Sequence, residues 1–200
     1  MRPSLALLST LLLLPVSARA LSKVEVDDLA HHPLVADFPS GGELAMHLRS
    51  GEIHIVGTDA NKVSVHVGGR RGEDSTDMRA RFESSGNQGS LRVAGGPNNE
   101  VTITVEIPRR ASLHLRVFAG EVNVTDIVGD KDIELSAGDL KVDVGNPADY
   151  AHVAASVTTG DLNASPFGEQ RDGLFRSFEK SGNGKYRLAA HVGAGDLILR

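Results

Sequence analysis

The feature that most constrains this chain is a repeated step made of a small residue, a glycine and an acidic residue. The glycines of the repeat are Gly51, Gly120, Gly138, Gly160 and Gly195. The acidic residues that follow them are Glu52, Glu121, Asp139, Asp161 and Asp196. Aliphatic and polar residues alternate on both sides of every copy. This period-two alternation predicts half-buried β-strands.

The alternation changes phase at each glycine. Around Gly120, for example, the aliphatic residues Leu115 and Val117 lie at odd distances before it, and Val122 and Val124 lie at even distances after it. Successive side chains of a strand point to opposite faces, so a straight strand would send one of these pairs into water. We therefore expect a bulge or corner at the glycine, with the acidic side chain facing solvent.

The spacing of the copies bears on the fold. Gly138 follows Gly120 by 18 residues, Gly160 follows after 22, and Gly195 after 35. A period near twenty favours an all-β solenoid, in which each turn buries its aliphatic face against its neighbours. The alternative is an antiparallel β-sandwich whose corners arose by duplication. Residues 60–107 alternate around glycine- and asparagine-rich turns, and this predicts an N-terminal antiparallel hairpin or meander.

The chain divides into segments of different character. Residues 1–20 have a positive start, an apolar run and a small-x-small site at Ala18–Ala20, which is the layout of a signal peptide. Residues 21–36 are expected to be a flexible segment leading into a single β-repeat domain at 37–200. Residues 166–187 fit no strand template and are interpreted as an inserted loop or cap. We expect an exported protein, periplasmic or extracellular, with no stable membrane span after cleavage.

Composition argues against several classes of function. The formal charge of −5 comes from charges of both signs scattered along the chain, which disfavours a nucleic-acid partner. The chain has no cysteine, so it has no disulfide framework. No nucleophile, base or metal arrangement typical of an enzyme is present in the sequence. We therefore predict no catalytic residue, no cofactor and no enzymatic activity.

One set of residues is a candidate for cation binding. Equivalent positions in a solenoid stack about 4.8 Å apart, so the acidic residues of successive turns would form a ladder. Its candidate members are Glu121, Asp139, Asp161 and Asp196. A cation between turns would relieve the repulsion of stacked carboxylates. The favoured alternative is that these carboxylates cap backbone amides at the corner.

The sequence also resembles a known family, the bacterial envelope proteins with β-strand repeats, which are adhesin-like and of unassigned function. The resemblance rests on Phe38–Leu44, on Arg49–Gly57, on Val101–Pro108 followed by Leu113–Leu115, and on the Gly-acidic-aliphatic repeats. It covers residues 36–200. The family implies a fold like a right-handed parallel β-helix and an envelope location, and it implies no site residues.

Three functional hypotheses follow. The leading one is a non-enzymatic envelope protein that presents a β-repeat surface to a partner, either a protein or an envelope polymer. The second is a carbohydrate-active enzyme on a β-helix, with carboxylates of the ladder as its acids. The third is a structural protein that associates with itself through open strand ends, because unpaired end strands invite edge-to-edge pairing.

Overall fold

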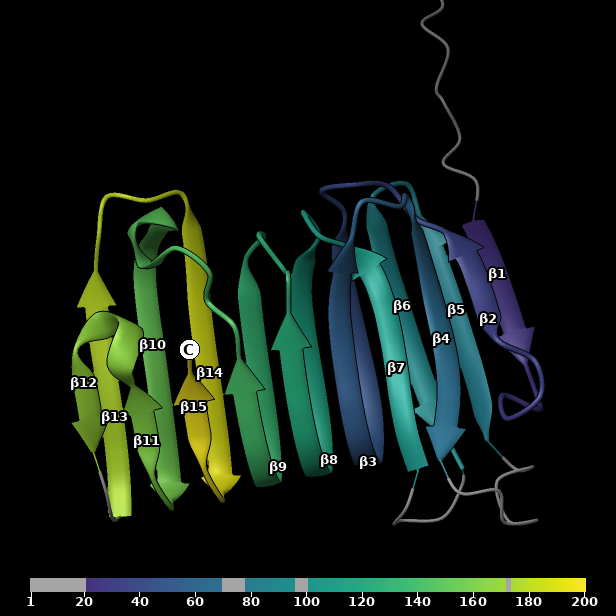
Figure 1. Cartoon of the computed structure of the whole chain (residues 1–200). Helices are drawn as coiled ribbons and strands as arrows, with labels where there is room; N and C mark the ends of the chain where they lie inside the picture. Colours follow the sequence, from purple (N-terminus) through teal and green to yellow (C-terminus); the bar gives the residue numbers. More distant parts are fainter. Residues whose placement is uncertain (1–20, 70–77, 96–100, 172–173) are drawn as a thin grey trace, which may run out of the picture.

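The computed structural model describes residues 21–69, 78–95, 101–171 and 174–200, and these residues are all-β. Their strands form one mixed sheet that does not close on itself (Figure 1). Two short 3-10 turns, Pro147–Asp149 and Ser165–Phe167, interrupt the strands. Within the described ranges, no helix is long and apolar enough to cross a membrane. The predicted signal peptide, residues 1–20, lies outside the described residues.

The strands of the N-terminal half are β1 (Leu21–Val26), β2 (Leu34–Asp37), β3 (Glu43–Thr58), β4 (Lys62–Gly69), β5 (Arg79–Ser85), β6 (Gln88–Ala94) and β7 (Val101–Pro108). Those of the C-terminal half are β8 (Ser112–Thr125), β9 (Lys131–Val142), β10 (Tyr150–Thr159), β11 (Leu162–Ala164), β12 (Glu169–Arg171), β13 (Leu174–Ser181), β14 (Tyr186–Ala194) and β15 (Leu197–Leu199).

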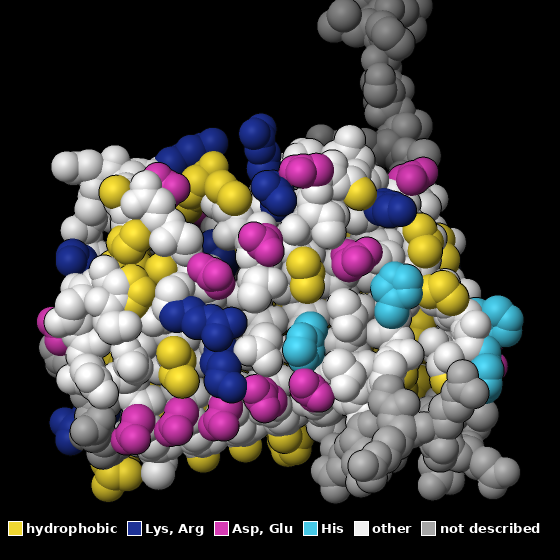
Figure 2. Space-filling model, viewed as in Figure 1, with side chains coloured by type: hydrophobic (Ala, Val, Ile, Leu, Met, Phe, Trp, Pro, Cys, Tyr) yellow, Lys and Arg dark blue, Asp and Glu magenta, His cyan; other side chains and the backbone are white. Residues whose placement is uncertain are grey.

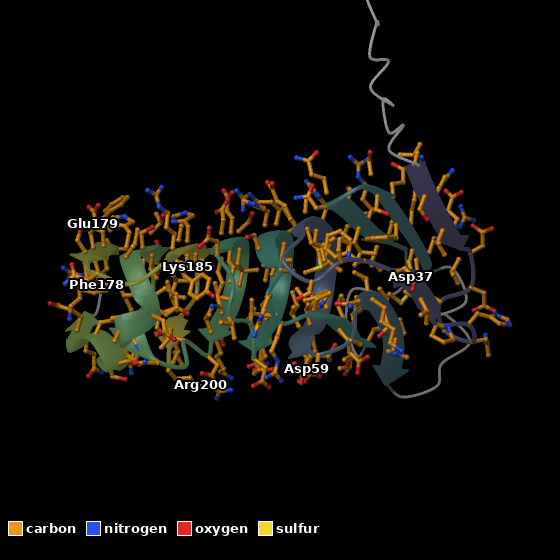
Figure 3. All side chains as sticks on the ribbon, turned by 90° about the horizontal axis from the view of Figure 1, so that it is seen from above. Asp37, Asp59, Phe178, Glu179, Lys185 and Arg200 are labelled. Carbon is orange, nitrogen blue, oxygen red and sulfur yellow. The ribbon has the colours of Figure 1, made fainter. Side chains whose placement is uncertain are left out.

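The sheet folds over into two facing layers, which Figure 3 shows from above. The long strands β3, β8 and β9 bend at their glycines, so each contributes its first half to one layer and its second half to the other. The first layer has the order β1-β5-β6-β3-β8-β9-β14-β10-β13. The second layer contains β2, β4, β7, the second halves of the long strands, β15, β11 and β12.

Strand direction differs between the middle and the ends of the sheet. From β6 and β7 through β3, β8, β9 and β14 to β10, neighbouring central strands are parallel. The outer pairs β1–β5, β5–β6, β4–β7 and β10–β13 are antiparallel. Within residues 60–107, β5 and β6 form an antiparallel hairpin in the first layer, and β4 and β7 form an antiparallel pair in the second layer, so the segment is antiparallel as predicted but not one continuous meander.

The core lies between the two layers and follows the predicted alternation. In β8, Leu113, Leu115 and Val117 are buried before the corner, and Val122 and Val124 are buried after it. One row of inward side chains runs through every strand of the first layer, including Val24, Phe82, Leu91, Met46, Leu115, Ile133, Ala190, Ala155 and Phe178. Each such large apolar side chain contributes about 1.5–3 kcal/mol when fully buried.

The corner predicted at the repeated glycine is confirmed. The glycines have φ between +118° and +133°, a region that side-chain-bearing residues rarely adopt. They also stack on one another: a Cβ at Gly120 would lie 2.0 Å from the carbonyl oxygen of Gly51, and one at Gly138 equally close to that of Gly120. The glycine is therefore required both by the bend and by the close approach of the neighbouring backbone.

The two segments expected to be irregular contain strands. Residues 21–36 contain β1, which pairs with β5, and β2, which pairs with β4. In β1, Lys23 and Glu25 alternate with Val24 and Val26, and the two valines pack against the core. This alternation is too short to stand out in the sequence. Residues 166–187 hold β12 and β13, and Phe167 and Phe178 from this segment are buried with ring centroids 5.9 Å apart.

Candidate functional site

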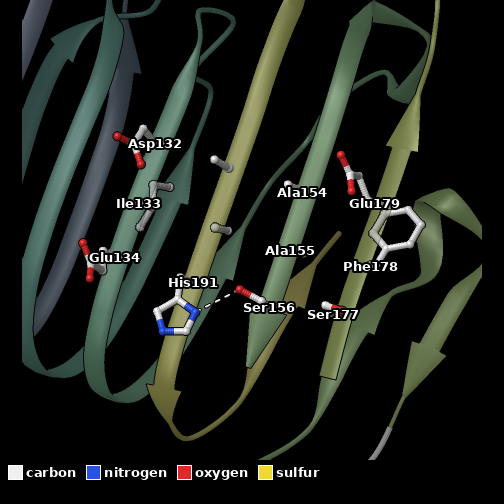
Figure 4. A pocket seen from close by; sticks show the side chains of 12 residues that line it. Asp132, Ile133, Glu134, Ala154, Ala155, Ser156, Ser177, Phe178, Glu179 and His191 are labelled. Atoms are coloured by element: carbon white, nitrogen blue, oxygen red, sulfur yellow. Dashed lines mark hydrogen bonds between the residues drawn. The ribbon is translucent and has the colours of Figure 1, made fainter. Parts of the chain in front are cut away.

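A shallow groove crosses the outer face of the first layer, over β9, β14, β10 and β13 (Figure 4). Its volume is about 350 Å³, at the lower end of the range for ligand sites. Carboxylates, hydroxyls and an imidazole provide its polar groups: Asp132, Glu134, Ser156, Ser177, Glu179 and His191. The groove can therefore offer a ligand both hydrogen-bond acceptors and donors.

The floor of the groove is low because its outward side chains are small. Ala189 of β14 and Ala154 of β10 are neighbours in register, between Asp132 on one side and Glu179 on the other. Backbone alternation points these four side chains outward, while Ile133, the residue after Asp132, faces the core. The hollow forms because the small residues on β14 and β10 lie between the larger residues on β9 and β13.

One wall of the groove is held in place by a network of ion pairs. The Arg116 guanidinium contacts Asp132 at 2.8 Å and Glu134 at 2.9 Å. His114 lies 3.3 Å from Asp132 and 3.2 Å from Glu43. The hydrogen bond from Arg116 holds the pKa of the Asp132 carboxyl below its usual range, against the opposing effect of partial burial. The Asp132 side of the groove therefore stays charged well below neutral pH.

A serine and a histidine meet in the middle of the groove. Ser156 Oγ lies 2.9 Å from His191 Nδ1, and Glu134 is the register neighbour of His191 on the other side. A serine nucleophile needs a base and also donors placed for the oxyanion. The backbone of β9, β14 and β10 is paired strand to strand here, so its N–H groups serve the sheet ladder. The Ser156 hydroxyl and the His191 imidazole can form hydrogen bonds with a polar ligand in the groove.

The acidic ladder exists, but in a different order from the sequence. Figure 2 shows a row of Asp and Glu side chains along the lower edge of the molecule. Because β14 and β15 lie between β9 and the β10–β11 pair, Asp196 is placed between Asp139 and Asp161. Glu121 neighbours Asp139 on the other side, and Glu52 follows Glu121.

Three of the four predicted ladder carboxylates, those of Glu121, Asp139 and Asp196, contact other protein groups. Asp139 Oδ1 accepts a hydrogen bond from the Asp196 amide at 3.1 Å, and Asp196 Oδ1 accepts one from the Asp161 amide at 3.0 Å. The Lys141 ammonium, 2.6 Å from Glu121, lowers the pKa of that carboxyl. Among the described residues, no group of three or more histidine, aspartate and glutamate side chains is placed to hold a metal ion.

Sequence reasoning missed a buried lysine. Lys131 is only 2% exposed and occupies a core row between Leu113 and Leu188. Its ammonium donates to Tyr150 Oη at 2.8 Å and to the Gly129 carbonyl at 3.3 Å, and Tyr150 Oη donates to the Val144 carbonyl at 3.0 Å. Burial lowers the pKa of Lys131 to about 8 and raises that of Tyr150.

Comparisons with known proteins give a structural similarity only. No family model matches the chain, and no curated protein matches it in sequence. The crystal structure of a "putative cell adhesion protein" from Clostridium sporogenes superposes with a TM-score of 0.52. The match covers 84% of this chain and 99% of the other, with 11% sequence identity. With so low a sequence identity, this similarity shows a shared fold only.

Proposed function

We propose that this chain is a non-enzymatic, exported protein of the cell envelope whose groove face binds a partner, either a protein or an envelope polymer. The observation that carries the proposal is the groove over β9, β14, β10 and β13, with an ordered ion-pair wall on a rigid sheet. A face fixed by strands loses little conformational entropy on binding, which favours recognition of an extended ligand.

Two further observations support this function. The name of the structural neighbour from Clostridium sporogenes refers to cell adhesion, which accords with an adhesin-like role. The layout of residues 1–20 is that of an export signal. The backbone N–H groups around Ser156 and His191 are used in strand pairing, and this favours binding over catalysis at this pair.

The scaffold we propose for this function is a β-solenoid. Supporting this is the in-register stacking of corners, in which Gly51, Gly120 and Gly138 are successive register partners. From β8 to β9 the chain passes through the corner into the second layer and returns to the next strand of the first layer, whereas β14 lies between β9 and β10. Such a scaffold presents equivalent positions in straight rows, and a polymer with its own repeat can follow these rows.

The experiment is co-sedimentation of the purified protein with isolated cell-envelope fragments. Wild type is expected to sediment with the fragments. Replacing Ala189 by Lys raises the groove floor and brings a charge between its walls, so binding should fall about tenfold or more, the loss that corresponds to about 1.4 kcal/mol. The matched control is Ala94→Lys, because Ala94 is exposed on β6, away from the groove and from the ion pairs of its wall.

The outcomes separate clearly. Binding by wild type and Ala94→Lys together with loss of binding by Ala189→Lys supports the proposal. Failure of wild type to sediment with the fragments, or equal loss in the two variants, contradicts it. Circular dichroism of both variants establishes that they are folded before they are compared.

A further inference from the structure

The two ends of the first layer are open strand edges. β1 pairs only with β5, and β13 only with β10, among the strands that the structure describes. Each end strand therefore presents one side of its backbone away from the sheet. An unpaired strand edge is a template on which another strand can add.

Both ends also carry exposed large apolar side chains. Leu21 on β1 is 73% exposed, and Val35 on the adjacent β2 is 50% exposed. At the other end, Leu174 and Phe175 on β13 are 60% and 80% exposed. Phe175 also has φ of +52°, which is strained for a bulky residue. Both edge strands also carry charges, Lys23 and Glu25 at 2.8 Å from each other on β1 and Glu179 on β13, so an added strand has to match these charges as well as cover the apolar side chains.

The register places complementary residues at opposite ends of the same row. Lys23 on β1 and Glu179 on β13 belong to one outward row, whose members are Lys23, Glu83, Ser90, Ala45, His114, Asp132, Ala189, Ala154 and Glu179. The neighbouring inward row begins with Val24 and ends with Phe178. A second molecule added in the same register would bring Lys23 opposite Glu179, and Val24 opposite Phe178.

Strand direction permits this addition. β1 is antiparallel to β5, which is antiparallel to β6, so β1 runs in the direction of the central strands. β13 is antiparallel to β10 and runs the opposite way. Therefore β1 of one molecule and β13 of the next would form an ordinary antiparallel pair, continuing both the hydrogen-bond ladder and the in-out alternation.

We propose that copies of this chain associate head to tail, with β1 of one copy paired to β13 of the next. The two surfaces differ, so the contact is heterologous and builds an open array rather than a closed dimer. Such an array would align the grooves of successive copies along one sheet. The occupant of each open edge is thus a second copy of the chain.

Sedimentation velocity of the mature chain, residues 21–200, across a wide range of concentrations tests this. Wild type is expected to form species that grow in size with concentration. Lys23→Glu and Glu179→Lys each place like charges opposite one another at the contact and should weaken association about tenfold. The double variant Lys23→Glu/Glu179→Lys, or an equimolar mixture of the two single variants, should restore it because the charges are again complementary.

A matched control is Arg92→Glu, which reverses a charge on the same outer face but on β6, away from both ends. It should associate as wild type does. The proposal is overturned if wild type sediments as one species at all concentrations. It is also overturned if only one of the two end variants has an effect, because that result indicates a two-fold contact of β1 with β1 or of β13 with β13. Failure of the charge swap to restore association equally overturns it.

Discussion

At the scale of single residues, Lys131 is the least expected feature of the core. This lysine lies between Leu113 and Leu188 in an inward-facing row, and its partners are the Tyr150 hydroxyl and a backbone carbonyl. Within hydrogen-bonding distance it has no carboxylate among the described residues. Desolvation of the ammonium is therefore only partly compensated, and this lowers the pKa of Lys131 to about 8.

Replacing Lys131 by Met should stabilise the protein at pH 7 by about 1–3 kcal/mol, because an apolar chain of similar length fills the same space without a buried charge. The measurement is urea unfolding followed by circular dichroism. Lys62→Met, at an exposed position of β4, is the matched control and should change the free energy of unfolding by less than about 0.5 kcal/mol. A loss of stability in Lys131→Met would show that the ammonium is a net stabiliser.

The same lysine gives a pH dependence with a definite sign. Between its folded pKa of about 8 and its unfolded value near 10.5, the unfolded chain binds more protons at this residue than the folded chain does. Stability of wild type should therefore rise with pH through this window. The advantage of Lys131→Met over wild type should shrink between pH 8 and pH 10. A constant difference across that range would contradict burial of the charge.

At the scale of elements, the corner decides whether the two layers can form. Replacing Gly138 by Ala would place a Cβ 2.0 Å from the Gly120 carbonyl oxygen, at a backbone φ of +118°. We expect a loss of about 3 kcal/mol or more, or failure to fold, since both overlap and backbone strain contribute. Thermal unfolding measures it. Gly68→Ala, where no atom of the described residues lies within 4 Å of the added Cβ, is the control and should change stability little. Equal tolerance of the two changes would refute the stacking of the corners.

The elements also show how far sequence reasoning extends. The alternation around Gly120 is local, so the strands on both sides and the corner between them could be predicted from the phase of the aliphatic residues. The position of β14 between β9 and β10 could not be predicted, because each repeat has the same small-Gly-acidic step and can pair equally well with any other repeat. The order of similar strands depends on tertiary packing, which short-range pattern does not encode.

The groove was beyond prediction for a related reason. Its lining comes from β9, β14, β10 and β13, so no contiguous motif marks it. Ala154 and Ala189 look unremarkable in sequence, and they matter only because register places them side by side. The acidic ladder, in contrast, could be read from the repeat. Two of its carboxylates, those of Asp139 and Asp196, accept hydrogen bonds from the amide of the neighbouring corner, which is the kind of contact that the amide-capping alternative describes.

At the scale of the whole molecule, the two faces differ in what they offer a partner. In Figure 3, Glu179 points outward from the first layer, whereas Asp59 and Arg200 point outward from the second. The hollow over β9, β14, β10 and β13 lies on the outside of the first layer. A partner bound there would cover Glu134 and Glu179 and leave the carboxylates of the second layer in contact with water.

The central claim, that the groove face is the binding face, is tested most directly by carboxyl footprinting with and without envelope fragments. Glu134 and Glu179 should be labelled less when the protein is bound, while Asp59 in the loop before β4 and Glu106 on the second layer keep their labelling. Protection of Asp59 and Glu106, with Glu134 and Glu179 unchanged, would contradict the account and place binding on the opposite face.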